Sequence, residues 1–222
     1  MSTTTILLRP AFTAHVGVRR ARARRGWRAP FHADPPARPL ERCPHAMAGL
    51  DRNNPDGGKT DWREMYSVLS EYGVKVLDAR EVKRRLERNR AVCVDVRIEK
   101  ESRQACILNS LVVPLYQPIS GLAPYKIARR AAFLAFGVLE ATELNADFCD
   151  KVQEFVGPDV PVILVCGIGG TLDTDASYPY GRRSRSLEAA YYLLQEGFRD
   201  VSILDGGISA WGKAGFDVYA AE

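Results

Sequence analysis

Cys166 is the cysteine with the strongest chemical context. It ends the apolar run PVILVC and is followed by the glycines of GIGG, after which a polar stretch leads to the helical pattern SRSLEAAYYLL. Backbone N–H groups of a glycine-rich loop and the positive end of a helix both stabilise negative charge. A thiol placed there favours its thiolate form, which is the nucleophile of cysteine chemistry. Free cysteines are also common as small buried apolar residues, so spacing alone leaves both interpretations open.

The remaining cysteines have weaker contexts. The chain contains five cysteines and no CxxC pair, so neither a zinc site nor a thioredoxin-type motif is indicated. We therefore expect free thiols, no bound metal and no cofactor. Cys93 lies among valines and is predicted to be a core residue, while Cys106 and Cys149 lack basic or glycine-rich neighbours.

The elements that must position Cys166 alternate along the chain. Short apolar strands are predicted at residues 74–77, 91–97, 111–115, 161–166 and 201–207. Helical patterns are predicted at 62–73 after a cap at Asp61, at 79–88 after Asp78, and at 99–104, 125–141, 145–157 with Asn145 as cap, 184–198 and 208–216. This alternation predicts an α/β fold with an open parallel sheet and helices on both faces.

Ligands of open α/β sheets bind beyond the carboxyl ends of the strands. Three of the predicted strands deliver chemically notable residues to that edge. They are Asp95 with Arg97, Cys166, and the turn Asp205-Gly206-Gly207. The sequence therefore predicts a site at this edge, with Cys166 at its centre.

The order of AVCVDVR, VPLY and VILVC, followed by a loop and RSLEAAYYLLQEGFRDVSILDGGISAWGKAGF, resembles a rhodanese domain over residues 74–217. The resemblance implies an open parallel sheet with a nucleophilic cysteine at the end of its central strand. It further implies transfer of sulfane sulfur from a thiosulfate-like donor to a thiol or cyanide acceptor, through a persulfide on Cys166. The implied partners are a small sulfur donor and a thiol acceptor.

The same resemblance assigns further site residues. It implies that substrate is bound by Gly167, Gly169, Gly170, Arg183, Arg185 and Ser186. Asp95 and Arg97 match the Asp-Val-Arg signature of the family, where a structural ion pair at the sheet edge is the favoured role.

The segment GRRSRS can be aligned with the family's loop-closing Arg-Ser in two registers. One register uses Arg183 with Ser184, and the other uses Arg185 with Ser186. We favour the second, because it keeps the family spacing to Ala189 and Ala190 in the helix.

The chain departs from the family pattern in the loop itself. The family arginine follows the cysteine by five positions, whereas Arg185 lies nineteen positions after Cys166. The inserted segment carries Asp173 and Asp175, which would repel an anionic donor, and loops of this length are usually lids or flexible segments. A helical insert near 124–140 is a second departure, and ACILNS at 105–110 replaces a His-Ile-Pro-Gly-Ala turn.

Three functions remain open. The first is an active sulfurtransferase. The second is a catalytically weak rhodanese-like binding module, in which loop 171–183 recruits a protein partner and Cys166 is a redox-sensing or vestigial thiol. The third is a cysteine-dependent phosphatase, which would need a general acid and a loop length that the sequence does not show. GIGG is no nucleotide loop, because no lysine follows it.

The N-terminal segment differs in composition from the rest. Residues 1–33 contain seven arginines and no Asp, Glu or Lys, behind the tip MSTTT. This predicts an organellar transit peptide over residues 1–46, with the Ser/Thr tip favouring chloroplast over mitochondrion; a plain basic tail is the alternative. Beyond residue 46 the chain has 22 basic and 25 acidic residues, so no nucleic-acid partner is indicated.

The predicted organisation is therefore a disordered transit peptide at 1–46, a linker with a short helix at 47–73, the rhodanese-like domain at 74–217 and a tail at 218–222. No run approaches the roughly 18 apolar residues of a membrane-spanning helix. We expect no integral membrane segment.

Overall fold

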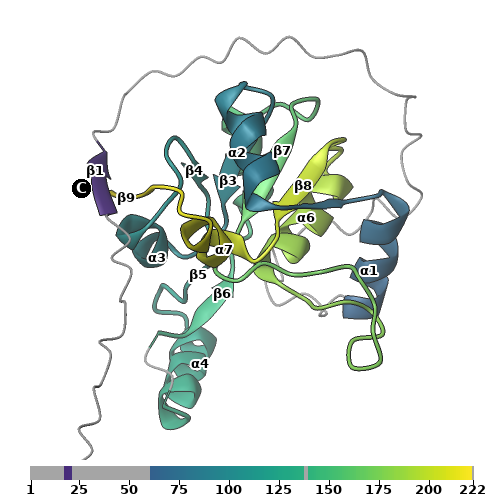
Figure 1. Cartoon of the computed structure of the whole chain (residues 1–222). Helices are drawn as coiled ribbons and strands as arrows, with labels where there is room; N and C mark the ends of the chain where they lie inside the picture. Colours follow the sequence, from purple (N-terminus) through teal and green to yellow (C-terminus); the bar gives the residue numbers. More distant parts are fainter. Residues whose placement is uncertain (1–17, 22–60, 138–139, 222) are drawn as a thin grey trace, which may run out of the picture.

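The fold is built on a five-stranded parallel sheet, seen in a computed structural model that describes residues 18–21, 61–137 and 140–221 (Figure 1). The strands lie in the order β2-β8-β7-β3-β4. Their bounds are β2 Lys75–Leu77, β3 Val92–Asp95, β4 Leu111–Val112, β7 Val162–Val165 and β8 Val201–Leu204. The open parallel sheet predicted from the sequence is confirmed, and β7 occupies its centre.

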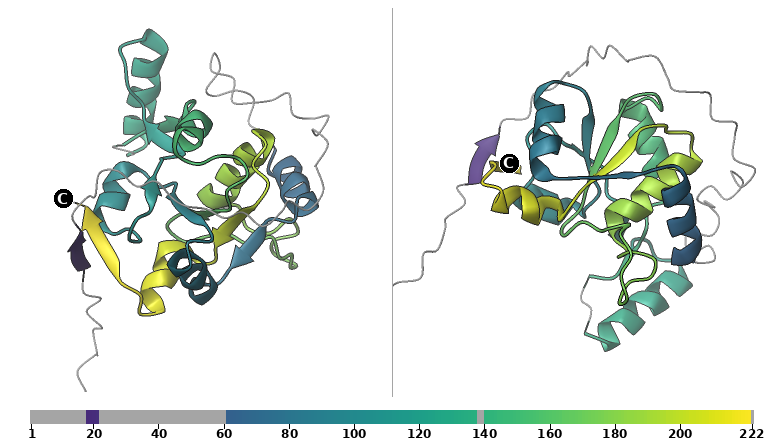
Figure 2. Two further views of the ribbon diagram at one scale, coloured as in Figure 1. Left: turned by 90° about the horizontal axis from the view of Figure 1, so that it is seen from above. Right: turned by 45° about the vertical axis from the view of Figure 1, so that its right-hand side comes forward.

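Helices cover both faces of this sheet (Figure 2). The first face packs against α1 (Trp62–Glu71), α5 (Phe148–Phe155) and α6 (Arg185–Gln195), and the second against α2 (Ala79–Glu87) and α7 (Gly207–Lys213). The other helices are α3 (Glu99–Gln104) and α4 (Pro124–Ala135). Two apolar clusters, one on each side of the sheet, therefore form the core.

Strand β7 decides where the side chain of Cys166 lies. All four of its residues are buried, as expected for a central parallel strand covered on both faces. Successive side chains of a strand alternate between faces, and Ile163 and Val165 pack in the cluster of α2 and α7. Leu164 and Cys166 accordingly belong to the other cluster, beside α6.

The helix caps confirm two predictions and correct a third. The carboxylate of Asp61 accepts a hydrogen bond from the backbone N–H of α1, and that of Asp78 accepts two from α2. The predicted cap Asn145 was wrong, because Asp147 is the residue that precedes α5. The Asn145 amide instead donates to the carbonyl of Pro114 at 2.9 Å, which ties this segment to the sheet.

A short antiparallel pair was not foreseen. Strands β5 (Tyr116–Pro118) and β6 (Thr142–Leu144) pair on either side of α4. The helix predicted over 125–141 therefore ends earlier, at Ala135, and is followed by Gly137 with a φ of +77°. A left-handed glycine just beyond the last turn is a common helix stop.

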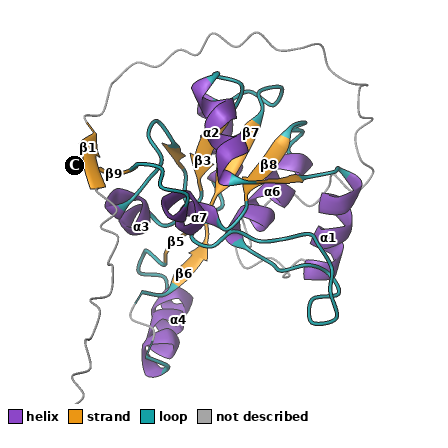
Figure 3. Ribbon diagram, viewed as in Figure 1, coloured by secondary structure: helices purple, strands orange, loops and turns teal. Residues whose placement is uncertain are grey.

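A second pair links the two ends of the chain. Strand β9 (Val218–Ala221), in the segment predicted as a tail, pairs in parallel with β1 (Val18–Ala21), which lies within the range predicted as transit peptide (Figure 3). The rest of that range and residues 47–60 lie outside the described residues. In the described part of the chain, no helix has the length and apolar character needed to span a membrane.

Candidate active site

Cys166 lies directly after β7 and packs against the start of α6. Its side chain is buried, and its Sγ lies 3.3 Å from the Oγ of Ser186, in the first turn of α6. The Oγ of Ser186 contacts the Oγ of Ser184 at 3.0 Å, and the latter accepts a hydrogen bond from the backbone N–H of Leu187. The sulfur therefore sits beside the positive N-terminal end of α6, linked to it by two serine hydroxyls.

Two of the three glycines after Cys166 are required by close packing. Gly169 has a φ of +64°, and a Cβ there would lie 2.5 Å from the backbone N of Gly206. A Cβ at Gly170 would lie 2.5 Å from the Oγ of Ser184. Gly167 is less constrained, since its Cβ would make an ordinary contact of 3.5 Å with the Arg185 guanidinium. Two of the three predicted loop glycines thus have a steric reason.

The residues that follow the turn Asp205-Gly206-Gly207 are hydrogen-bonded to the loop that begins at Cys166. The backbone N–H of Ile208 donates to the carbonyl of Cys166 at 2.9 Å, and the backbone N–H and Oγ of Ser209 donate to the carbonyl of Gly167. These bonds hold both carbonyls against the start of α7. The backbone N–H groups of residues 167–170 donate to no acceptor in the described part of the chain. They form a set of unused donors directly after the sulfur.

The two candidate arginines have different partners. The Arg185 guanidinium lies beside Gly167 and pairs with the carboxylate of Glu101 on α3 at 2.9 Å. Arg183 pairs with the buried carboxylate of Glu188 at 2.6 Å, which also accepts a hydrogen bond from the hydroxyl of Tyr116. The structure thus brings Arg185 and Ser186 to the Cys166 loop, in the favoured register, and directs Arg183 elsewhere.

Asp95 and Arg97 form a buried ion pair at the end of β3. The Arg97 guanidinium donates to both carboxylate oxygens of Asp95, at 2.6 to 3.2 Å, and also to the carbonyl of Ala105 after α3. Burial alone would lower the pKa of Arg97, but hydrogen bonding to Asp95 and its charge raise it. These contacts tie the end of β3 to the end of α3, whose Glu101 pairs with Arg185.

The inserted segment is closed off at its base. The backbones of Thr171 and Arg182 pair through two hydrogen bonds, of 2.8 and 3.2 Å. A Cβ at Gly181, whose φ is +63°, would lie 2.2 Å from the carbonyl oxygen of Thr171, so only glycine permits this closure. Residues 172–181 therefore form an insertion whose first and last residues lie next to each other.

Helix α1 holds the base of the insert. The indole Nε1 of Trp62 donates to the carbonyl of Tyr180 at 3.0 Å, and the Tyr66 ring packs edge-on against that of Tyr180. At the tip, the Asp175 carboxylate accepts hydrogen bonds from the N–H groups of Ser177 and Tyr178 and shapes a local turn. Loop 171–183, which the sequence predicts to recruit a protein partner, thus has a defined conformation held by contacts at its base and its tip.

The other described cysteines lack the surroundings of Cys166. Burial raises the pKa of the Cys149 thiol from 9.0 to about 12, and burial with the charge of Asp95 raises that of Cys93 further. Burial also raises the pKa of Cys106, whose Sγ contacts the carbonyl of Tyr219. Cys43 lies outside the described residues. Within the described ranges, no cluster of three or more His, Cys, Asp or Glu side chains could hold a metal ion.

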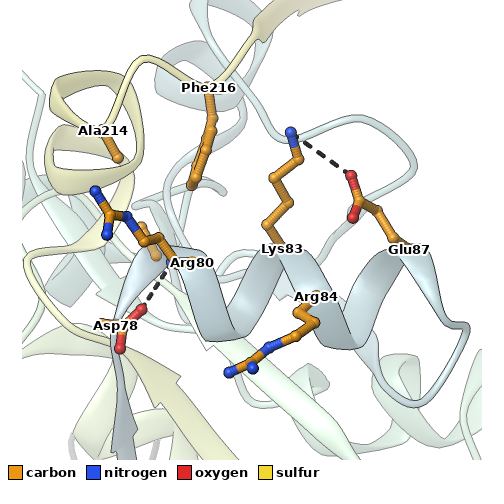
Figure 4. A pocket seen from close by; sticks show the side chains of 8 residues that line it. Asp78, Arg80, Lys83, Arg84, Glu87, Ala214 and Phe216 are labelled. Atoms are coloured by element: carbon orange, nitrogen blue, oxygen red, sulfur yellow. Dashed lines mark hydrogen bonds and ion pairs between the residues drawn. The ribbon is translucent and has the colours of Figure 1, made fainter.

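Two clefts lie away from the sulfur. One, of about 770 Å³, lies between α2 and the end of α7, where Lys83 covers the ring of Phe216 and pairs with Glu87 (Figure 4). A second, of about 600 Å³, lies beside α3 and β5. Cys166 lines neither. Neither of these two clefts therefore belongs to the Cys166 site.

Sequence reasoning missed the role of one residue of this site and the whole of another. Ser184, named from the sequence only in the register that was not favoured, is the N-cap of α6, and its position just before a helical pattern is a recognisable capping signal. Glu101 could not have been found, because it lies 84 positions from Arg185 and nothing local relates the two.

Comparison with known proteins agrees with this architecture. Residues 78–214 match the rhodanese-like domain family. The chain is 35% identical, over 164 residues, to the rhodanese-like domain-containing protein 14, chloroplastic, of Arabidopsis thaliana, covering 74% of this chain and 73% of the relative. The fold and the relative together define the class, and this chain belongs to the rhodanese-like domain family.

Solved structures resemble the chain at lower identity. The rhodanese-like domain of the Anabaena protein Alr3790 is 17% identical with a TM-score of 0.41, covering 64% of this chain and 76% of that one. A thiosulfate sulfurtransferase of Pseudomonas aeruginosa is 22% identical with a TM-score of 0.40, covering 71% of this chain and 22% of that enzyme.

Proposed function

We propose that the chain is a sulfurtransferase that carries sulfane sulfur on Cys166. The observation that carries this proposal is the set of unused backbone N–H groups at residues 167–170, directly beyond a cysteine beside the N-terminal end of α6. Such donors stabilise the negative charge of a terminal persulfide sulfur. A purely structural cysteine would have no need of them.

The transfer proceeds in two displacements. The Cys166 thiolate attacks the outer sulfur of a thiosulfate-like donor, a new S–S bond forms, and the S–S bond of the donor breaks so that sulfite leaves with its electron pair. The resulting persulfide anion is held by the loop N–H groups. An acceptor thiolate then attacks the outer sulfur, forms its own persulfide and returns Cys166 as thiolate.

The residues around Cys166 have different roles in the proposed transfer. The Ser186 hydroxyl lies within hydrogen-bonding range of the sulfur. Arg185 brings positive charge to the rim at Gly167, but Glu101 neutralises much of it. Because a neutralised arginine attracts an anionic donor weakly, we expect a high KM for thiosulfate. Asp95 and Arg97 act only by positioning α3.

The test is direct detection of the intermediate. The full chain is incubated with thiosulfate, and intact-protein and peptide mass spectrometry locate any gain of one sulfur atom. We expect the gain on Cys166, its absence in Cys166→Ser, and its retention in the matched variant Cys149→Ser. No gain on Cys166 with thiosulfate or with a persulfide donor overturns the proposal. Cys166-dependent phosphate release from an aryl phosphate would support the phosphatase instead.

A binding module remains the second candidate, because residues 173–179 of the insert are exposed while its base is anchored on α1. Replacing residues 173–179 by a short glycine linker keeps the Thr171–Arg182 closure. If the chain is mainly a catalyst, this variant retains persulfide formation. Capture of a plastid protein that survives in Cys166→Ser and is lost in the loop variant would favour the module.

We also propose a plastid location, with residues 1–46 as transit peptide. The proposal is supported by the arginine-rich, acid-free leader and by the chloroplastic relative. Residues 1–46 fused to a fluorescent reporter should direct it to chloroplasts. Reporter confined to mitochondria or to the cytosol would contradict the assignment.

A further inference from the structure

Helix α4 projects from the body of the domain (Figures 1 and 2) and is linked to β6 through the ion pair of Lys126 with Glu143. None of its residues is buried. Half of the exposed large apolar side chains in the described part of the chain lie in this one segment: Leu122, Tyr125, Ile127, Leu134 and Phe136. Leu122 and Phe136 are 85% and 86% exposed. A concentration of this kind marks an interaction surface.

The domain is attached to the polar side of α4. The ammonium group of Lys126 pairs with the carboxylate of Glu143 on β6 at 2.9 Å, and the Arg130 guanidinium donates to the carbonyl of Gly121. With 3.6 residues per turn, the alanines of α4 fall on the side opposite Lys126, and Ile127 and Leu134 lie about a quarter turn from Lys126, at one edge of that alanine face. The apolar face therefore points away from the domain and can meet a flat surface.

The charges on α4 indicate which kind of surface could cover its apolar face. Residues 119–137 contain Lys126, Arg129 and Arg130 and no Asp or Glu. On the helical wheel, Arg129 and Arg130 fall at the two borders of the apolar face, with Lys126 between them on the polar side. An apolar face bordered by cations is the pattern of a helix lying in an anionic membrane interface.

We propose that α4 lies in the plane of a bilayer that contains anionic lipids. Its apolar face enters the boundary between headgroups and acyl chains, while Arg129 and Arg130 meet lipid phosphates. The contact is peripheral and is independent of the proposed sulfur transfer. It would hold the domain at the membrane through the β5–β6 pair that carries α4.

Hydrogen exchange of the full chain, followed by mass spectrometry, tests this contact where it occurs. Vesicles of phosphatidylcholine with phosphatidylglycerol should slow amide exchange in residues 122–136, and vesicles of phosphatidylcholine alone should not. This local readout matters because the leader arginines could by themselves bind an anionic vesicle. Flotation without slowed exchange in α4 would assign binding to the leader and overturn the proposal.

Variants test each half of the surface. Arg129→Gln and Arg130→Gln should each raise, about fivefold, the vesicle concentration that half-slows amide exchange in residues 122–136, the scale of one cation at an anionic surface. Phe136→Ser should raise it as well, whereas Phe155→Ser on α5, also exposed, serves as the matched control and should not. Equal protection by both vesicle types contradicts the anionic assignment. Protection that rises with protein concentration without lipid would assign the face to a second copy of the chain.

Discussion

Gly207 offers the sharpest test of how the Cys166 loop is held. Its φ is +58°, and a Cβ there would lie 2.3 Å from the carbonyl oxygen of Cys166 and 2.8 Å from the backbone N of Gly169. A non-glycine residue in the left-handed region costs about 1–2 kcal/mol. Overpacking adds about 1–3 kcal/mol. We therefore expect Gly207→Ala to lower the free energy of unfolding by about 2–5 kcal/mol in total.

Gly215 supplies the matched control, since its φ is +77° and a Cβ there would meet nothing within 4 Å. Gly215→Ala should lose only the backbone part, about 1–2 kcal/mol. Urea denaturation of both variants measures the difference, and persulfide formation reports the geometry of the loop. Only Gly207→Ala should lose persulfide formation. Equal destabilisation of the two variants, or unchanged sulfur uptake in Gly207→Ala, would refute the inferred support of the loop.

Three further outcomes follow from the same contacts. Ser186→Ala removes the hydroxyl beside Cys166 and should slow persulfide formation about fivefold, the value of one hydrogen bond, measured by rapid quenching; an unchanged rate would remove Ser186 from the site. Asp95→Asn leaves the Arg97 charge buried and should cost about 3–5 kcal/mol in urea denaturation, and a loss below about 1 kcal/mol would mean that water reaches the pair. The pKa of the Cys149 thiol is 9.0 in the unfolded chain and about 12 in the folded one. Between these values only the unfolded state loses the proton, so the free energy of unfolding should decrease as the pH rises from 9 towards 12. The urea midpoint followed over this range should fall less steeply in Cys149→Ala, and an identical slope would contradict the assignment.

The sheet was predictable because its signals are local. Each strand is a short apolar run, and Asp61 and Asp78 mark the helix starts that the structure confirms. The β5–β6 pair was missed because three-residue strands of mixed polarity give no period. Strand β9 was missed for another reason: its neighbours, at Cys106 and Val18–Ala21, are remote in sequence.

The site was predictable in part. Cys166, the loop glycines and the register of Arg185 and Ser186 followed from spacing and resemblance, and the structure brings these residues together. The sequence could not reveal that the insert is closed at its base, since this depends on a backbone pair between Thr171 and Arg182. Nor could the sequence show that Arg183 pairs with Glu188, because the burial of that carboxylate depends on the tertiary fold.

Helix α1 sets a limit on how far the N-terminus can be trimmed. The match to the family begins at residue 78, yet Met65 and Leu69 are fully packed in the core and Trp62 holds the insert. A recombinant fragment cut at the family boundary would lose this helix together with strand β2, and would expose the apolar surface that both cover. For the same reason, any protease that matures the chain must cut before Asp61.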